Sequence, residues 1–263
     1  MLRGCENKHE MTKQHRFILW VVIVIVGIGS RLIHTGWIVF DYLRYTQPMF
    51  VASDLEGTLS TGTFVLAIGR YLMAHGSNMR YRLFFLGQMP AFVRNKLKRT
   101  DTQTFKNNWF LGLTRLLKGM TPAQLAHMGK WVIEQELWPQ RREAVIAEVI
   151  AHQRNGAQLI LASGMFQPTL EQFAARIGSN IVCLGTPLQF VDGVFTGEVG
   201  AIGIGEVKAA QVRAHIGSSA LAAAYGDTEA DQYLLDLSQH ATAVYPDEGL
   251  RKIAQERGWR ILD

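Results

Sequence analysis

The sequence predicts an α/β fold, a parallel sheet with a long helical segment inserted after its first strand. A short apolar run at residues 49–52, MFVA, has the character of a buried strand. Residues 62–150 then contain few strand-like runs, and their apolar residues recur at helical spacing. Beyond residue 150, strand-length apolar runs alternate with helix-length segments, which indicates parallel strands joined by right-handed crossovers.

The composition is that of a folded globular chain. With 263 residues the chain can form one large domain or two small ones, and its 48% hydrophobic and 19% charged content argues against general disorder. The two cysteines, Cys5 and Cys183, have no metal-ligand spacing, which argues against a disulfide framework and a zinc ribbon. We interpret Cys183 as a small buried hydrophobe.

Charge is distributed unevenly along the chain. The net charge is +5, yet residues 62–150 alone hold thirteen Lys or Arg against five Asp or Glu. A basic insert in an acidic framework suits an anionic substrate or an anionic surface. The alternative is a set of solvated helix faces that happen to be basic.

The first 48 residues contain an apolar run, residues 17–29, preceded by basic residues and soon interrupted by Arg31. Three interpretations are open: a membrane anchor through residues 17–38, an extension from a start codon assigned too far upstream, or an apolar helix packed on the domain. The second is motivated by Met49, from which the first strand would begin. We expect a cytoplasmic catalytic domain, with a membrane-anchored protein as the alternative.

The insert at residues 62–150 is predicted to hold four or five helices. Residues 111–120 and 124–137 show apolar residues three and four apart, as amphipathic helices do. Thr121 and Pro122 form a suitable helix start, with Thr as N-cap and Pro at the first helical position.

The rest of the chain alternates helices and strands. Helices are predicted at residues 143–156, 167–178, 205–217, 230–238 and 246–258. Strands are predicted at residues 157–163, 180–190, 220–227, 241–245 and 259–262, with a hairpin at 191–199 that turns at Asp192-Gly193. The expected organisation is an N-terminal apolar segment at 1–48, a core of 49–61 plus 151–263, and a helical domain at 62–150.

Four groups of polar residues fall at predicted strand ends or helix starts. They are Asp54 with Glu56, Ser163 with Gly164, Lys208, and Asp227 with Asp231. The carboxyl ends of parallel strands meet at one edge of a sheet, where active sites lie. Paired acids at the end of a buried strand repel each other and are costly unless a cation or a reaction needs them.

These four groups, in this order, resemble the haloacid dehalogenase superfamily, and most closely its phosphoserine-phosphatase-like branch (subfamily IB). The resemblance runs from about residue 50 to the C-terminus and includes the closing VYPDEGLRKIAQERGWRIL. It implies a Rossmann-like core with an all-helical cap after the first strand. It also implies a phosphatase that acts through an aspartyl-phosphate.

The resemblance assigns a role to each residue at a matching position. Asp54 would be the nucleophile, and Glu56 the general acid and base. Ser163, the amide of Gly164 and Lys208 would bind the phosphoryl oxygens. Taken singly, Ser163 could be a helix N-cap and Lys208 a solvated helix residue.

The resemblance also implies a Mg²⁺ site. Asp54, the backbone carbonyl of Glu56 and Asp227 would be its ligands. Asp231 would orient the lysine or the metal-bound waters, or would simply be charge in the first turn of a helix.

Two departures from the family pattern bear on function. Glu56 stands where the family usually has Asp, which shifts the carboxylate by about one bond length. Phosphoserine phosphatases usually carry a glutamate soon after the first motif, whereas residues 60–72 contain no acid, which puts phosphoserine in doubt. Residues 80–99 are basic and aromatic, so the expected substrate is a small or a lipid phosphate. The candidate contacts are Arg80, Arg82, Arg94 and Arg115.

Other classes of function remain as alternatives. A phosphotransferase, or a membrane-associated or binding module with a weakened site, would fit if Glu56 does not support full activity. Nucleic-acid binding is not expected, because the basic insert carries no recognised nucleic-acid-binding motif.

Overall fold

The computed structural model describes residues 49–76, 78–96 and 102–263, which form one compact unit. The three interpretations of residues 1–48, including an anchor at 17–38, lie outside these residues. None of the helices within the described ranges combines the length and the hydropathy that a bilayer crossing requires.

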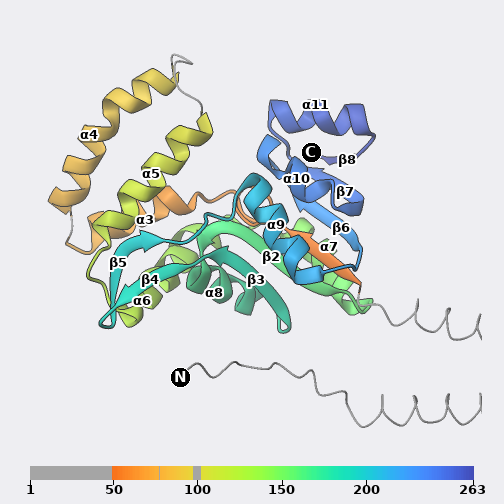
Figure 1. The fold of residues 1–263 in the computed structure, drawn as a ribbon, viewed down its shortest axis with the longest axis horizontal. Coiled ribbons are helices and arrows are strands. Elements are labelled where there is room, and N and C mark those ends of the chain that lie inside the picture. Colours follow the sequence, from red (N-terminus) through yellow and green to blue (C-terminus); the bar gives the residue numbers. More distant parts are fainter. Residues whose placement is uncertain (1–48, 77, 97–101) are drawn as a thin grey trace, which may run out of the picture. The chain divides into compact units, whose positions relative to one another are not determined.

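The centre of the fold is a six-stranded sheet in which every pairing is parallel (Figure 1). Its order is β3-β2-β1-β6-β7-β8. The strands are β1 (Phe50–Ser53), β2 (Gln158–Phe166), β3 (Ile181–Thr186), β6 (Leu221–Gly226), β7 (Ser238–Val244) and β8 (Arg260–Leu262). This confirms the predicted Rossmann-like α/β fold.

Strand β1 is central, and both of its faces are covered. Its four residues are all buried, as expected for a strand of a parallel sheet that carries helices on both sides. Phe50 and Ala52 point into one hydrophobic cluster and Val51 into the other. The first cluster is completed by α9 (Gly205–Ile216), α10 (Gln232–Leu235) and α11 (Glu248–Arg257).

The second cluster joins the sheet to the inserted helices. Helix α8 (Gln167–Ile177) and all the helices between β1 and β2 contribute to it. The inserted elements are α3 (Phe64–Ala74), α4 (Asn78–Lys96), α5 (Thr102–Leu116), α6 (Pro122–Val132), a π-helical turn (Ile133–Leu137) and α7 (Glu143–Arg154). In the described ranges the insert thus has four α-helices before α7, in agreement with the predicted four or five, and α7 corresponds to the helix predicted at 143–156.

The inserted helices differ in where they pack. Helices α4 and α5 lie side by side (Figure 1), and α6 begins at a capping box in which Thr121 and Gln124 exchange hydrogen bonds of 2.8 and 3.3 Å. Helix α7 packs on β1 and β2. The expected domain boundary at residue 150 therefore falls inside a helix that covers the sheet.

Two predicted elements differ from those in the structure. The strand at 180–190 divides at Pro187 into β3 and β4 (Leu188–Val191), because proline cannot donate a ladder hydrogen bond. Strand β4 pairs with β5 (Val194–Val199) through the predicted turn, where Asp192 and Gly193 both have positive φ. The helix predicted at 230–238 is only a 3₁₀ turn (Glu229–Asp231) followed by α10. Cys183 is half-buried in β3 rather than fully buried.

Phe166, at the end of β2, connects the sheet to the insert. Its ring is fully buried and lies 5.1 Å from that of Phe64 on α3 and 5.5 Å from that of Phe110 on α5, centroid to centroid. The ring of Phe195 on β5 is 6.4 Å away. Aromatic contacts of this kind stabilise a fold beyond their buried area.

Replacing Phe166 should therefore weaken the whole unit. We expect Phe166→Ala to lower the free energy of unfolding by about 3–5 kcal/mol, because it removes a large buried ring and leaves a cavity. The matched control is Phe190→Ala, whose side chain is 40% exposed, with an expected loss of about 1 kcal/mol or less. Urea unfolding measures both, and equal losses would contradict this role for Phe166.

Candidate active site

The four polar groups meet at the carboxyl edge of the sheet. Asp54 directly follows β1, and its N–H donates to the carbonyl of Tyr225 on β6 at 3.0 Å. Asp227 directly follows β6, Ser163 lies in β2, and Lys208 lies in the first turn of α9. All of them line one cavity of about 620 Å³, which also includes residues of the insert.

Lys208 lies between two carboxylates. Its Nζ donates to Asp54 Oδ1 at 2.7 Å and to Asp231 Oδ1 at 2.6 Å, and all three side chains are buried. Burial by itself would lower the pKa of Lys208, but the charges of Asp231 and Asp54 outweigh it and raise that pKa. The lysine is therefore charged and held in place from both sides.

Asp231 is fully engaged by protein donors. While Oδ1 accepts from Lys208, Oδ2 accepts from the N–H of Asp227 at 3.2 Å and from the N–H and hydroxyl of Thr228 at 3.0 and 2.9 Å. Burial alone would raise the pKa of Asp231, but Lys208 and these hydrogen bonds lower it. Asp231 thus fixes both the lysine and the loop that carries Asp227.

The loop after β1 approaches Asp227 closely. Thr58 Oγ1 donates to Asp227 Oδ1 at 3.0 Å, and Gly57 has a φ of +89°. A Cβ on Gly57 would lie 1.9 Å from Asp227 Oδ2, so only glycine allows this approach.

The arrangement of acids fits a divalent cation. Carboxylate oxygens of Asp54, Asp227 and Asp231 lie within 4.8 Å of one another, with Lys208 as the nearby buried cation. Burial raises the pKa of Asp54 to about 6 and that of Asp227 to about 8; the charge of Asp231 adds to both shifts, and Lys208 opposes them. An oxygen donor set with excess negative charge is what Mg²⁺ prefers.

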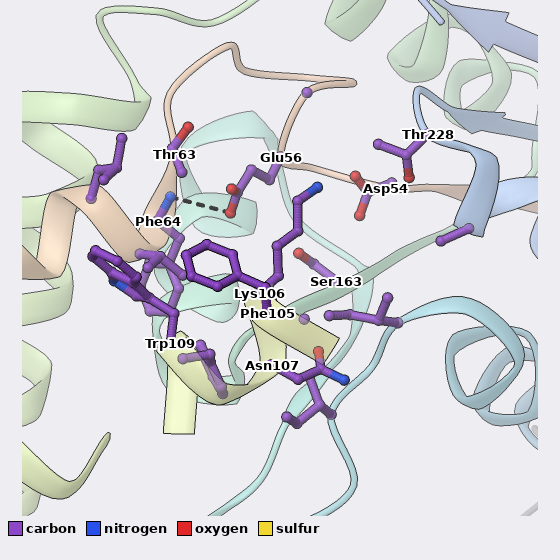
Figure 2. A pocket seen from close by; sticks show the side chains of 18 of the residues that line it. Asp54, Glu56, Thr63, Phe64, Phe105, Lys106, Asn107, Trp109, Ser163 and Thr228 are labelled. Carbon is purple, nitrogen blue, oxygen red and sulfur yellow. Dashed lines mark hydrogen bonds between the residues drawn. The ribbon is translucent and has the colours of Figure 1, made fainter. Parts of the chain in front are cut away.

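Glu56 connects the site to the first inserted helix (Figure 2). Its Oε2 accepts from the N–H of Phe64, the first residue of α3, at 3.1 Å. Desolvation raises the pKa of Glu56 to about 7, although the Phe64 N–H opposes this shift. The extra methylene of glutamate relative to aspartate extends the carboxylate to this helix N-terminus.

Ser163 and Gly164 lie before the end of β2 rather than at it. The pairing of β2 with β3 is irregular between Ala162 and Phe166, and the buried Ser163 hydroxyl accepts from the N–H of Met165 at 3.4 Å. A Cβ on Gly164 would come within 2.9 Å of the Ile204 side chain. Both residues line the cavity.

The sequence analysis did not identify the insert residues that line the cavity. The four arginines considered as substrate contacts, Arg80, Arg82, Arg94 and Arg115, all lie among the described residues, and none of them lines the cavity. Lys106 and Asn107 of α5 line it instead. The available signal was the helical spacing of Phe105, Trp109 and Phe110 on the same helix.

Comparison with known proteins identifies the family. The model of the haloacid dehalogenase-like hydrolases matches residues 51–236, so the chain belongs to this family. Phosphoserine phosphatase SerB1 of Mycobacterium tuberculosis is 30% identical over 221 residues, which span 80% of this chain and 69% of that protein. The predicted superfamily, its phosphoserine-phosphatase-like branch and the phosphatase class of enzyme are confirmed.

Solved structures show the same fold. A Bordetella pertussis protein of unknown function has a TM-score of 0.67 and 22% identity, covering 83% of this chain and 99% of its own. A phosphoserine phosphatase, solved as an analogue of its phospho-aspartyl intermediate, has a TM-score of 0.53 and 15% identity, covering 82% of this chain and 94% of its own.

Removal of Lys208 should destabilise the protein in a pH-dependent way. In Lys208→Met, Asp54 and Asp231 lose their cation, and we expect a loss of about 3–5 kcal/mol at neutral pH in the absence of metal. The lowered pKa of Asp231 stabilises the native state only above about pH 4, where the unfolded carboxyl ionises. Without the lysine, burial opposes that ionisation, so the loss should be greater at pH 8 than at pH 5.

Thermal unfolding of the wild-type protein and of Lys208→Met, in EDTA from pH 5 to pH 8, measures the effect. A loss of stability that is the same at every pH, or that grows toward low pH, would contradict the ion-pair explanation.

Proposed function

We propose that the protein is a Mg²⁺-dependent phosphomonoesterase that acts through an aspartyl-phosphate on Asp54. The observation that carries the proposal is the buried Lys208 between Asp54 and Asp231, with Asp227 beside them. This arrangement supplies the positioning and the charge neutralisation that phosphoryl transfer requires. Residues 62–150 would form the cap over a core of residues 49–61 and 151–263.

In the first step an oxygen of Asp54 attacks phosphorus, and the bond from phosphorus to the ester oxygen breaks. Glu56 donates its proton to the departing alkoxide. Ser163, the amide of Gly164 and Lys208 hold the phosphoryl oxygens and balance their charge. The pKa of Glu56, raised to about 7 by desolvation, suits a group that must donate a proton near neutral pH.

In the second step a water attacks the phosphorus of the aspartyl-phosphate. Glu56, now ionised, takes a proton from that water, and the bond from phosphorus to the Asp54 oxygen breaks. Inorganic phosphate leaves, and both carboxyl groups return to their starting states.

Asp54, Asp227 and the backbone carbonyl of Glu56 would hold the Mg²⁺. The ion, when bound, would neutralise charge on the carboxylates and on the phosphoryl group. Both oxygens of Asp231 already accept protein hydrogen bonds, so Asp231 acts by positioning Lys208 and the Asp227 loop.

The substrate is a phosphomonoester of a small molecule or a lipid. SerB1 is named a phosphoserine phosphatase, which supports a small phosphorylated metabolite. Against phosphoserine itself stands the absence of any acid in residues 60–72 of this chain.

Hydrolysis of p-nitrophenyl phosphate by the full chain tests the reaction. Turnover is expected with Mg²⁺ and should be lost in EDTA. Asp54→Asn should lower kcat by at least about 10⁴-fold, as removal of a catalytic nucleophile does. Because this variant is nearly isosteric, its thermal unfolding serves as the folding control, and turnover retained in Asp54→Asn or in EDTA would contradict the mechanism.

The role of Glu56 is tested with two leaving groups. Glu56→Gln keeps an oxygen to accept the Phe64 N–H but cannot transfer a proton. We expect kcat/KM to fall by about 10²–10⁴-fold for an alkyl phosphate, and much less for p-nitrophenyl phosphate, whose leaving group needs no acid.

Equal losses in kcat/KM for the two substrates would count against Glu56 as the acid. Glu56→Asp provides the matched comparison, because it can transfer a proton but is shorter by the methylene that extends Glu56 to α3.

A further inference from the structure

The two ends of the cavity differ in chemistry. Asp54, Glu56, Ser163, Lys208 and Asp227 line one end, and they come from the sheet, its loops and the first turn of α9. Helices α3, α4 and α5 supply an apolar wall. We define this apolar wall as the side chains of Phe64, Phe85, Met89, Phe92, Phe105, Trp109 and Phe110.

Charge is confined to the catalytic end. Among the described residues that line the cavity, α3 to α5 contribute one cation, Lys106, and no carboxylate. Figure 2 shows Lys106 extending from α5 toward Asp54 and Glu56, and its charge lowers the pKa of Glu56. An ammonium group placed against the apolar wall would therefore have no counter-ion, which is costly.

The apolar wall has surface left for a ligand. Trp109 is 8% exposed and packs edge-on against Phe85 and Phe105, which fixes the base of the wall. Phe85 and Phe92 remain 39% and 42% exposed while lining the cavity. A volume of about 620 Å³ is in the range that encloses ligands much larger than a phosphorylated amino acid.

We propose that the apolar wall binds the leaving group of the substrate, and that this group is large, uncharged and apolar, either an aryl ring system or an alkyl or acyl chain. The inference rests on the proposed function, because the phosphate must lie at the catalytic end. The leaving group then extends from the ester oxygen along Phe105 toward Phe85 and Phe92, where its burial removes apolar surface from water.

Binding of n-alkylphosphonates to the full chain with Mg²⁺ tests this without any turnover. Calorimetry on the series from ethyl to octyl should show Kd falling about two- to fourfold for each added methylene. The zwitterionic 2-amino-3-phosphonopropionate should bind no more tightly than ethylphosphonate. Phenyl- and naphthylphosphonate form a second, aryl series. The series in which affinity rises more with ligand size identifies the kind of apolar group that the wall accepts.

Two neighbouring residues of α4 give a matched pair of variants. Phe92 lines the cavity and lies 6.2 Å, centroid to centroid, from the Phe105 ring, whereas Val93, 52% exposed, does not line it. Phe92→Asn should weaken octylphosphonate binding at least tenfold and leave ethylphosphonate within twofold. Val93→Asn should change neither, which controls for non-specific binding of alkyl chains.

A Kd independent of chain length and ring size, or equal effects of Phe92→Asn and Val93→Asn, would overturn the inference. The proposed function is tested separately: it fails if the wild-type protein hydrolyses no p-nitrophenyl phosphate, or if Asp54→Asn still hydrolyses it. A chain-length dependence without turnover would keep the apolar binding site and remove the phosphatase mechanism.

Discussion

The arrangement of the candidate site depends on the burial of Lys208 between Asp54 and Asp231. Removing one partner of a buried ion pair is costly because it leaves the other charge without compensation. This single interaction joins the end of β1, the first turn of α9 and the loop after β6. With Asp227 added, negative charge is in excess, which makes the same site suitable for a divalent metal ion, and the charge of such an ion would in turn offset that of a phosphate.

The insert contacts the sheet through two kinds of interaction, one apolar and one polar. Phe166 and its aromatic neighbours fix α3 and α5 on the sheet through apolar packing. Glu56 adds a polar connection at the catalytic end, where its carboxylate accepts from the N-terminus of α3. The proposed catalytic groups therefore come from the sheet, its loops and α9, whereas the surface that we propose to select the substrate comes from the insert.

Much of the candidate site could be predicted because it follows strand ends. Asp54 and Asp227 directly follow strands, and parallel strands bring such positions to one edge whatever the details of packing. Ser163 stands where an apolar run stops in the sequence, although it lies inside β2. The errors came from interactions that span the fold or interrupt a pattern. Pro187 divides an apolar stretch that reads as continuous, and hydrogen bonds to Asp231 replace the first turn of the helix expected at residues 230–238.

The sequence by itself determined the parallel sheet, the position of the helical insert, and the family, because periodicity and motif order are properties of the chain alone. Only the tertiary structure decided which insert residues reach the site. Arg80, Arg82, Arg94 and Arg115 were equally plausible from charge, yet the packing of α4 and α5 presents Lys106 and the apolar wall to the cavity. The face that a helix turns toward a site depends on what it packs against, and a single sequence does not contain that information.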